Sequence, residues 1–347
     1  MPEPMAARGR VTILDVAAAA GVSRQTVTRA MNDMAEIAPA TRERVLQVAR
    51  ELRYRPSRFG RDLVSGRRRT IALVVHSLIN PYYPELASAV VGAAARCGWN
   101  VVLADSRHAS SPKQLLADLG EQADVVVGYL GAIPPDHRGD LLPLVVIDGD
   151  AGSGHAVVRF DAAAAMADLA GHLAGAGVRH PVMAVPGSGN ARAREFAAAM
   201  ARHQVPVRVL TYPEHGAGAD GDPTRSGGED LDGGISVAAA LVREIQSGAA
   251  ATDAVLGFND LTACGLLKGF RRAGVAVPDQ VRVAGIDGLS LGTVVSPELT
   301  TLALDLDEVA EHAVDLAIEI FDGRTGPGET EGTARQVSHR LLVRESA

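Results

Sequence analysis

The sequence predicts a small all-α helix-turn-helix head followed by an α/β body of two doubly wound parallel-sheet lobes. Short helical segments with tight connections fill residues 12–53, and β-rich runs alternate with helical segments from Thr70. The alternation starts again after Asp161. Continuous apolar strands between helices are typical of parallel sheets that helices cover on both faces. About ten such strands in two successive groups favour two lobes over one large sheet.

In the head, the first helix is expected from Ile13 to Ala20, and Gly21 suits a turn that needs a positive φ. The second helix is expected after Ser23, a favourable N-cap residue, from Arg24 to about Asn32. A third helix follows Pro39, which is tolerated in a first helical turn.

The second helix has two distinct faces. Its apolar residues are expected to face inward: Val27, Ala30 and Met31. Its polar residues are left outward: Arg24, Gln25, Thr28 and Arg29. In helix-turn-helix geometry the N-terminal part of this helix enters the major groove, where Arg can pair with guanine and Gln with adenine. The alternative is a small helical bundle with a solvated, charged face.

The charge of the chain divides near residue 70. All 347 residues together carry a net charge of −7, which taken alone argues against a nucleic-acid partner. Residues 1–70, however, hold 14 basic and 7 acidic side chains, so their net charge is +7 and that of the remainder is −14. A cationic end on an anionic body is expected where one end meets a polyanion and the other does not.

Several classes of protein are excluded. No apolar run reaches the roughly 18–20 residues that a membrane span needs, and the first residues, MPEPMAARGR, lack the apolar stretch of a secretory signal. Cys97 and Cys264 are far apart in sequence, so we expect no disulfide framework and no metal site or cofactor. The sequence also lacks a G-x-S-x-G elbow, an H-E-x-x-H pair and a Walker loop, which argues against an enzyme.

Residues 11–66 resemble the DNA-binding head and hinge of the LacI/GalR family of bacterial transcriptional regulators. The motifs that carry the resemblance are VTILDVAAAAGVSRQTVTRAMN from Val11, TRERV from Thr41, LRYRP from Leu52 and RFGRDLVSG from Arg58. The resemblance implies that Arg24, Gln25 and Arg29 read bases, and that Leu63 of the hinge wedges into the minor groove of operator DNA. The residues expected to contact DNA are Ser23, Arg24, Gln25, Thr28, Arg29, Asn32, Arg58 and Leu63.

The body resembles the periplasmic-binding-protein-like effector domain of the same family over residues 70–344. Matching motifs include NPYY from Asn80, GFND from Gly257, VAGID from Val283 and PELTT from Pro297. The resemblance implies a cleft between two lobes that closes on a small molecule. Candidate effector contacts follow expected strand ends, where doubly wound sheets bind ligands: Tyr82, Tyr83, Asp148, Phe160, Arg192, Arg194, Asn259 and Asp287.

By motif position, Arg194 matches the Arg that clamps the ligand in the family, and Asn259 and Asp287 match residues that bind ligand hydroxyls. One Arg, one Asn and one Asp together suit a polyol, so a sugar is the default effector. For Phe160, packing in the core is an equal alternative. We expect the neighbouring Asp260 to cap the helix that follows it.

These observations divide the chain into a DNA-binding domain (1–57), a hinge (58–69) and an effector-binding and dimerisation domain (70–347). The first lobe is expected to comprise 70–161 and 290–322, and the second 162–289 and 323–347. The expected function is that of a sequence-specific transcriptional regulator, most often a repressor, whose affinity for operator DNA a sugar-like effector controls. We expect a homodimer in the cytoplasm, associated with the nucleoid and not with membrane. The alternative is a small-molecule-binding protein without a role on DNA.

Overall fold

The computed structural model describes residues 13–31, 37–52, 69–130, 142–149, 156–187, 190–212, 231–248, 251–323 and 333–347. The chain forms two compact units, Met1–Arg68 and Arg69–Ala347. The predicted DNA contacts Asn32, Arg58 and Leu63 lie outside the described residues, as does most of the predicted hinge.

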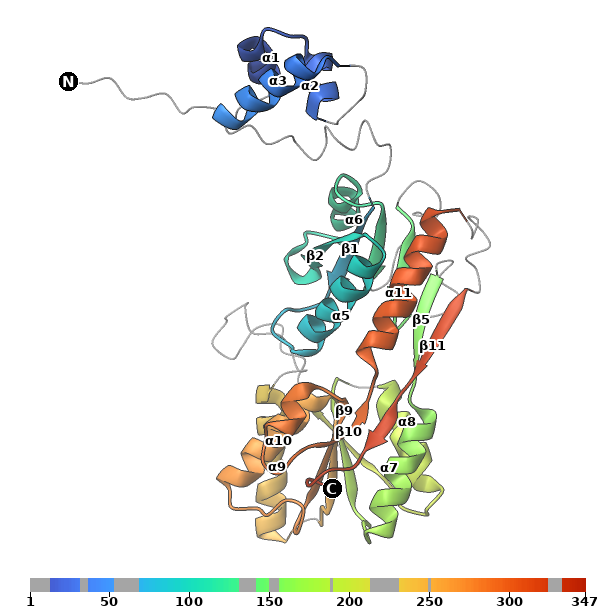
Figure 1. Cartoon of the computed structure of the whole chain (residues 1–347). Helices are drawn as coiled ribbons and strands as arrows, with labels where there is room; N and C mark the ends of the chain where they lie inside the picture. The colour runs from blue at the N-terminus through green and yellow to red at the C-terminus, as the bar shows by residue number, and fades with distance from the viewer. Residues whose placement is uncertain are drawn as a thin grey trace, which may run out of the picture. The chain divides into compact units, whose positions relative to one another are not determined.

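The first unit contains three short helices around a small apolar core (Figure 1). They are α1 (Ile13–Ala20), α2 (Arg24–Met31) and α3 (Pro39–Glu51). Gly21 has a φ of +63°, and the Val22 N–H donates to the Ala17 carbonyl at 3.0 Å, so the chain turns sharply after α1. The core holds Val16, Ala17, Ala20, Val27, Ala30, Val45 and Ala49. The three helices begin where the sequence predicted them.

The first lobe of the second unit is built on a parallel sheet in the order β11-β5-β4-β3-β1-β2. The strands are β1 (Thr70–Val75), β2 (Asn100–Asp105), β3 (Val125–Gly128), β4 (Leu144–Ile147), β5 (Ala156–Asp161) and β11 (Ala334–Ser338). The helices are α5 (Tyr82–Arg96), η1 (Ser106–His108), α6 (Pro112–Gly120) and α11 (Leu306–Phe321).

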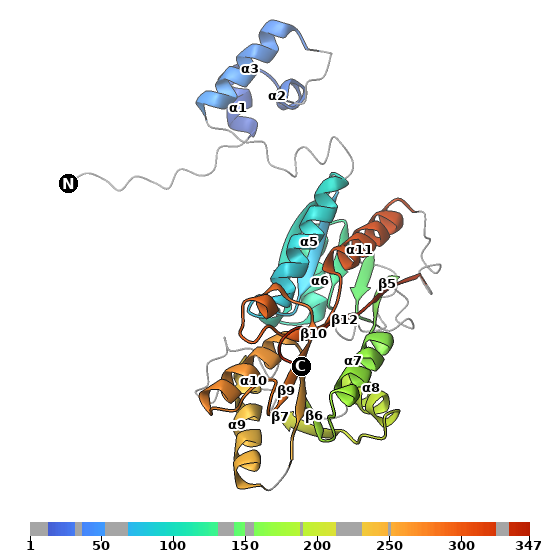
Figure 2. The same cartoon turned by 60° about the horizontal axis from the view of Figure 1, so that its bottom comes forward.

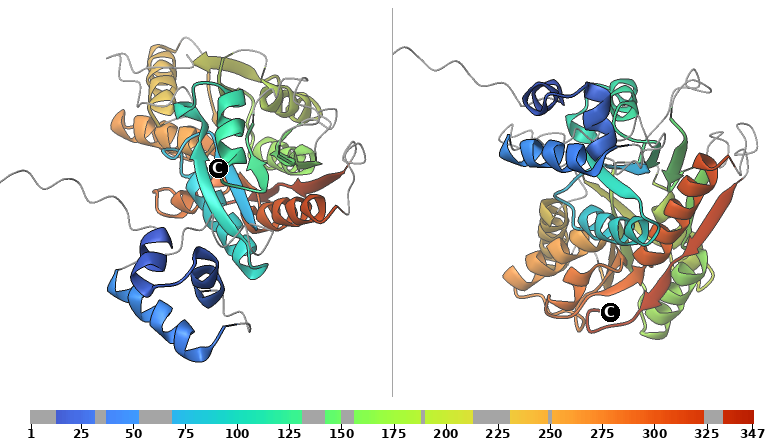
Figure 3. Two further views of the ribbon diagram at one scale, coloured as in Figure 1. Left: turned by 90° about the horizontal axis from the view of Figure 1, so that it is seen from above. Right: turned by 45° about the horizontal axis from the view of Figure 1, so that its top comes forward.

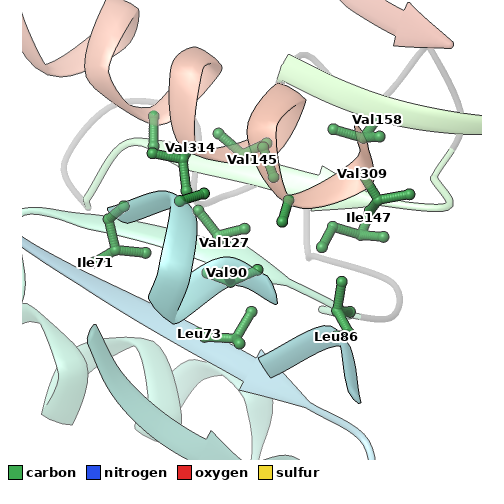
Figure 4. Packing of buried hydrophobic residues seen from close by; sticks show 14 of the residues in the cluster. Ile71, Leu73, Leu86, Val90, Val127, Val145, Ile147, Val158, Val309 and Val314 are labelled. Carbon is green, nitrogen blue, oxygen red and sulfur yellow. The ribbon is translucent and has the colours of Figure 1, made fainter. Parts of the chain in front are cut away.

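Both faces of this first sheet are buried. Alternate residues of β1 enter different cores: Ile71 and Leu73 pack with α5 and α11, whereas Ala72 and Val74 pack with α6. Figure 4 shows the first of these cores, in which Leu86 of α5 and other labelled side chains lie over the strands. Side chains alternate between the faces of a strand, so covering both faces requires apolar residues at nearly every position. This explains why the run TIALVV is continuously apolar.

The second lobe repeats the layered plan on a sheet in the order β12-β10-β9-β8-β6-β7, in which β12 alone runs antiparallel to its neighbour among the described strands. The strands are β6 (Pro181–Pro186), β7 (Arg208–Tyr212), β8 (Ala254–Gly257), β9 (Arg282–Asp287), β10 (Thr300–Ala303) and β12 (Arg340–Leu342). The helices are α7 (Ala163–Gly175), α8 (Ala191–Ala201), α9 (Leu231–Ser247), α10 (Asp260–Arg272) and η4 (Ser290–Thr293). Helices α7 and α8 cover one face, and α9 and α10 cover the other (Figures 2 and 3).

The predicted fold class is confirmed, but two segments lie in a different lobe from the one expected. Strand β10 pairs with β9, Thr300 opposite Ala284, so it belongs to the second lobe although residues 290–322 were expected in the first. Strand β11 pairs with β5, Ala334 opposite Val157, so it belongs to the first lobe although 323–347 were expected in the second. The chain therefore crosses between lobes after β5, between β10 and α11, and between β11 and β12. In the described ranges no helix is both long and apolar enough to cross a membrane.

Candidate functional site

The exposed face of α2 has the polar character that the sequence predicted. Val27 and Ala30 are buried in the core, whereas Arg24, Gln25 and Arg29 are exposed. Thr28 is half-buried and donates its hydroxyl to the Arg24 carbonyl at 3.1 Å.

The N-terminus of α2 is capped by Ser23, whose Oγ accepts the Thr26 backbone N–H at 3.1 Å. This bond satisfies one of the N–H groups that a helix start leaves without an intrahelical partner. Arg24 and Gln25 follow directly, so the cap fixes the backbone that carries both of them.

In the second unit, residues that directly follow four neighbouring strands line one cavity. His76 follows β1, Ser106 follows β2, Tyr129 follows β3 and Asp148 follows β4. The cavity has a volume of about 730 Å³, and its walls also include Tyr83 and apolar side chains. This size lies within the range of small-molecule sites, and the C-terminal edge of a parallel sheet is where such sites form.

An aromatic cluster stands at this edge. The hydroxyls of Tyr82 and Tyr129 lie 2.6 Å apart, and the rings of Tyr82 and Tyr83 meet edge to face with centroids 5.3 Å apart. Tyr83 also packs edge to face on Tyr129 at 5.4 Å. Tyr82 and Tyr83 are both buried, so most of their surface supports the core of the first lobe.

Arg192 of α8 lies at the ends of β8 and β9 in the second lobe. Its backbone N–H is bound by Asn190, the N-cap residue of α8, at 2.9 Å. Its Nη1 donates to the Phe258 carbonyl at 2.7 Å, and its Cζ lies 4.6 Å from the centroid of the Phe258 ring. Its Nη2 lies 4.0 Å from Asp287 Oδ1, a charge contact that is too long for a hydrogen bond.

Arg192 thus contacts Asp287. The ligand-clamping role that motif position gives to Arg194 stays a prediction. Arg194 is exposed two residues further along α8. Residues at i and i+2 of a helix do not face the same side, because each residue turns the helix by about 100°.

Two aspartates hold unusual backbone conformations, one at a strand end of each lobe. Asp148 has a φ of +55° and Asp287 a φ of +124°. Such conformations cost about 1–3 kcal/mol in a non-glycine residue and cluster at functional sites. Burial raises the pKa of Tyr82 far above its ordinary value, and the negative charges of Asp287 and Asp148 add to the rise. Both carboxylates therefore lie within electrostatic reach of one tyrosine.

Asn259 has a structural partner in addition to its predicted ligand role. It is buried, and its Oδ1 accepts the Thr262 N–H at 2.8 Å, which makes it the N-cap residue of α10. The expectation that Asp260 caps this helix is wrong, because Asp260 is the first helical residue and its carboxylate binds elsewhere.

Phe160 lies at the crossover between the lobes. Its half-buried ring meets that of His339 edge to face, with centroids 6.1 Å apart. His339 follows β11 and places its Nδ1 3.2 Å from the Asp161 carbonyl oxygen. Burial lowers the pKa of His339, the Asp161 carbonyl opposes this, and the positive charge of Arg192 adds to the lowering. His339, and with it Phe160, therefore lies within electrostatic reach of Arg192.

The matches to known proteins cover both units. Residues 12–57 match the bacterial regulatory proteins of the lacI family, and residues 170–347 match the periplasmic binding protein-like domain. A LacI family transcriptional regulator from Arthrobacter sp. FB24, solved in complex with lactose, is 31% identical, with a TM-score of 0.69 over 81% of this chain and 100% of that chain. The chain belongs to the LacI family.

Two further relatives match nearly the whole chain. The HTH-type transcriptional regulator CelR from Thermobifida fusca is 29% identical over 99% of this chain and 100% of its own length. The lac repressor dimer, solved on operator with the anti-inducer ONPF, shares the fold, with 20% identity and a TM-score of 0.72 over 97% of this chain and 99% of that chain. These LacI-family relatives are regulators of transcription and not enzymes. The chain is accordingly a DNA-binding transcriptional regulator under effector control.

Three residues of the candidate site were missed from the sequence: Tyr129, which lines the cavity, Phe258, which contacts Arg192, and His339, which contacts Phe160. Each directly follows a strand, as Asp148 does. The rule that ligands bind at the ends of parallel strands, which identified Asp148, therefore applies to these three residues too. Among the described residues no group of three or more His, Cys, Asp or Glu side chains could hold a metal ion.

Proposed function

We propose that this LacI-family protein is a homodimeric repressor whose affinity for operator is controlled by a neutral, polyhydroxylated effector bound between the lobes. The observation that carries the proposal is the placement of Arg192 beside Asp287, with Asp148 at the facing strand end. A guanidinium donates hydrogen bonds and a carboxylate accepts them, so the two together satisfy adjacent hydroxyls of a sugar or a related polar metabolite. The Arthrobacter relative that binds lactose supports the same class.

The guanidinium of Arg192 is already ordered by contacts within the protein. Phe258 contacts Arg192 through both its carbonyl and its ring, so the guanidinium needs little reordering on binding. A pre-ordered group loses less side-chain entropy when it binds, which favours affinity. Asn259 and Phe160 complete the proposed contacts, and Arg192 takes the clamping role that motif position gave to Arg194.

The charge of this arrangement favours a neutral effector over an anionic one. Asp148 and Asp287 contribute two negative charges, Arg192 contributes one positive charge, and burial lowers the pKa of His339, so this ring stays neutral at neutral pH. At these contacts a phosphorylated sugar would meet two negative charges and one positive charge. We therefore expect neutral sugars to bind more tightly than their phosphates.

On the DNA side, Arg24, Gln25 and Arg29 are proposed to contact base edges in the major groove, with Ser23 and Thr28 at the same surface. The lac repressor, which shares the fold, was solved as a dimer on operator, and this supports two heads on half-sites about 10 bp apart. The proposed contacts of Asn32, Arg58 and Leu63 stay predictions from sequence. By linkage, effector and operator must change each other's affinity by the same factor. The corresponding coupling free energy is commonly about 1–3 kcal/mol.

A thermal-shift panel followed by calorimetry tests the effector. The probes are lactose, cellobiose, ribose and glucose 6-phosphate, and a bound sugar raises the melting temperature by mass action. Arg192→Ala should weaken the bound sugar at least ten-fold, whereas Arg194→Ala, a matched change on the same helix, should leave its affinity within two-fold. An equal loss in both variants, or tightest binding of the phosphate, contradicts the proposed site.

In vitro selection of duplex DNA with the full chain tests the head. Arg29→Ala should lose preference for the selected sequence, at about 1–3 kcal/mol. Arg44→Ala, an exposed arginine of α3, serves as the charge-matched control and should keep that preference. The sugar from the panel should then change the affinity of the wild-type chain for the selected DNA.

A further inference from the structure

A buried carboxylate lies directly behind the turn that presents Asp287. Asp260, the first residue of α10, is fully buried. Its Oδ1 accepts the Thr301 hydroxyl at 2.6 Å, and its Oδ2 accepts the Leu289 N–H at 2.7 Å. The Gly288 N–H joins this network through Thr301, because it donates to Thr301 Oγ1 at 3.3 Å. Asp260 thus binds the Leu289 amide directly and is linked to the Gly288 amide through the Thr301 hydroxyl.

The turn needs such support because its backbone is strained. Asp287 has a φ of +124°, a region that non-glycine residues rarely adopt, and Gly288 has a φ of +80°. A Cβ at position 288 would lie 2.4 Å from the Ala303 Cβ, so only glycine fits there. The other anchor of the turn is the Leu304 N–H, which donates to the Asp287 carbonyl at 3.0 Å.

Strand β9 and Asp260 are also in direct contact. A Cβ on Gly285 would lie 2.2 Å from Asp260 Oδ1, so the strand approaches the carboxylate as closely as its backbone allows. Burying a carboxylate is costly unless hydrogen-bond donors surround it, and here the Thr301 hydroxyl and the Leu289 N–H donate to it. A residue with fewer acceptors, or with donors of its own, loses one of these hydrogen bonds or must reverse its direction.

We propose that Asp260 is a positioning residue for effector binding: it holds the turn from Asp287 to Leu289 so that the Asp287 carboxylate stays beside Arg192. The effector step of this inference rests on the proposed function. The structural step, in which Asp260 stabilises the turn from Asp287 to Leu289, can be measured without any effector.

Hydrogen–deuterium exchange of the full chain tests the structural step. In Asp260→Asn an NH2 group replaces one carboxylate oxygen, so a donor faces either the Thr301 hydroxyl or the N–H groups of the turn. The Gly288 and Leu289 amides should therefore exchange at least ten-fold faster than in wild type. Peptides from α7 should keep their protection, which shows that the lobe is folded. Thr301→Val removes both the hydroxyl that donates to Asp260 and the acceptor of the Gly288 N–H, with little change in side-chain size. It should accelerate the same amides, whereas Thr301→Ser should not. Unchanged exchange in both Asp260→Asn and Thr301→Val overturns the proposal.

A double-mutant cycle tests the effector step, with the panel sugar (lactose, cellobiose or ribose) that wild type binds. Asp260→Asn should weaken this sugar at least ten-fold by calorimetry, and Thr301→Ser should stay within two-fold. Since Asp260 acts through Asp287, adding Asp260→Asn to Asp287→Ala should weaken binding by less than two-fold more. Fully additive losses overturn a positioning role. If wild type binds no neutral sugar, the proposed function fails, while the exchange experiment still decides whether Asp260 holds the turn.

Discussion

Ser290 donates both its hydroxyl and its backbone N–H to Glu85 Oε1, at 2.6 and 3.3 Å. Glu85 belongs to α5 of the first lobe, whereas Ser290 lies in the connection from β9 to β10 of the second. The preceding residue, Leu289, is buried in the core of the first lobe. The segment that begins at Asp287 is therefore attached to both lobes, and a displacement of Asp287 reaches α5 through three residues of chain.

Glu85→Ala should weaken this attachment. Because Ser290 is exposed and Glu85 only half-buried, we expect the free energy of unfolding to fall by no more than about 1 kcal/mol. Urea unfolding measures the change. Glu195→Ala, an exposed carboxylate of α8, is the control and should be nearly neutral. A loss in the control that equals the loss in Glu85→Ala would show that the contact has no stabilising role.

The pair of hydroxyls on Tyr82 and Tyr129 predicts strongly non-additive mutants. Tyr129→Phe removes the partner of the hydroxyl of Tyr82, a buried residue, while Tyr129 itself is half-buried; the two hydroxyls lie 2.6 Å apart, and we expect a loss of about 1 kcal/mol. Replacing both tyrosines by phenylalanine removes donor and acceptor together and should cost less than the sum of the single changes. A urea-unfolding cycle on the four proteins measures the coupling, and strict additivity would contradict it.

The fold was largely predictable because its cores impose local patterns. Apolar runs such as TIALVV and the two-faced pattern of α2 follow from burial on both faces of a strand and on one face of a helix. The lobe assignment of β10 and β11 was not predictable, because it depends on pairing with distant strands. Strand β11 is moreover a half-exposed edge strand, and its residues ARQVS lack a continuous apolar run.

For the candidate site, the sequence predicted which strand ends contribute residues, but not which side chains contact one another there. The rule that ligands bind at the ends of parallel strands placed Asp148 and Asp287 correctly at the edges of their sheets, but it does not say that Arg192 contacts Asp287. Arg192 does so because Asn190 starts α8, and the rotation of the helix then fixes the direction of each following side chain. The role of Asp260 was equally hidden, since its donors come from residues about 30 to 40 positions away.

Loss of the Ser23 cap should weaken the head selectively. Ser23→Ala removes the acceptor for the Thr26 N–H, so we expect the start of α2 to lose about 1 kcal/mol of stability. Affinity for the selected DNA, measured by fluorescence anisotropy, should fall because Arg24 and Gln25 lie in the first turn. Ser111→Ala removes an equivalent cap, Ser111 Oγ to the Gln114 N–H at 3.1 Å, from α6 of the body. This control should leave DNA affinity unchanged, and an equal loss in both would contradict a local role for Ser23.

His339 predicts a pH dependence of stability. Burial lowers its pKa in the folded protein below the ordinary value of 6.5, the Asp161 carbonyl opposes the shift, and Arg192 adds to it. As the pH falls through about 6.5, the unfolded chain therefore binds a proton that the folded protein does not, and unfolding becomes more favourable. The contribution of His339 to stability is present above this pH and is lost below it.

Asp260 changes the stability with pH in the opposite sense, so its contribution must be separated from that of His339. Burial raises the pKa of Asp260 to about 7, so the folded protein takes up that proton first and gains stability as the pH falls. The informative quantity is thus the free energy of unfolding of wild type minus that of His339→Gln, measured in urea at pH 5, 6, 7 and 8. We expect this difference to shrink steadily from pH 7 to pH 5, because only wild type carries the titrating ring. A constant difference over the whole range would mean that His339 has the same pKa in the folded and unfolded chains.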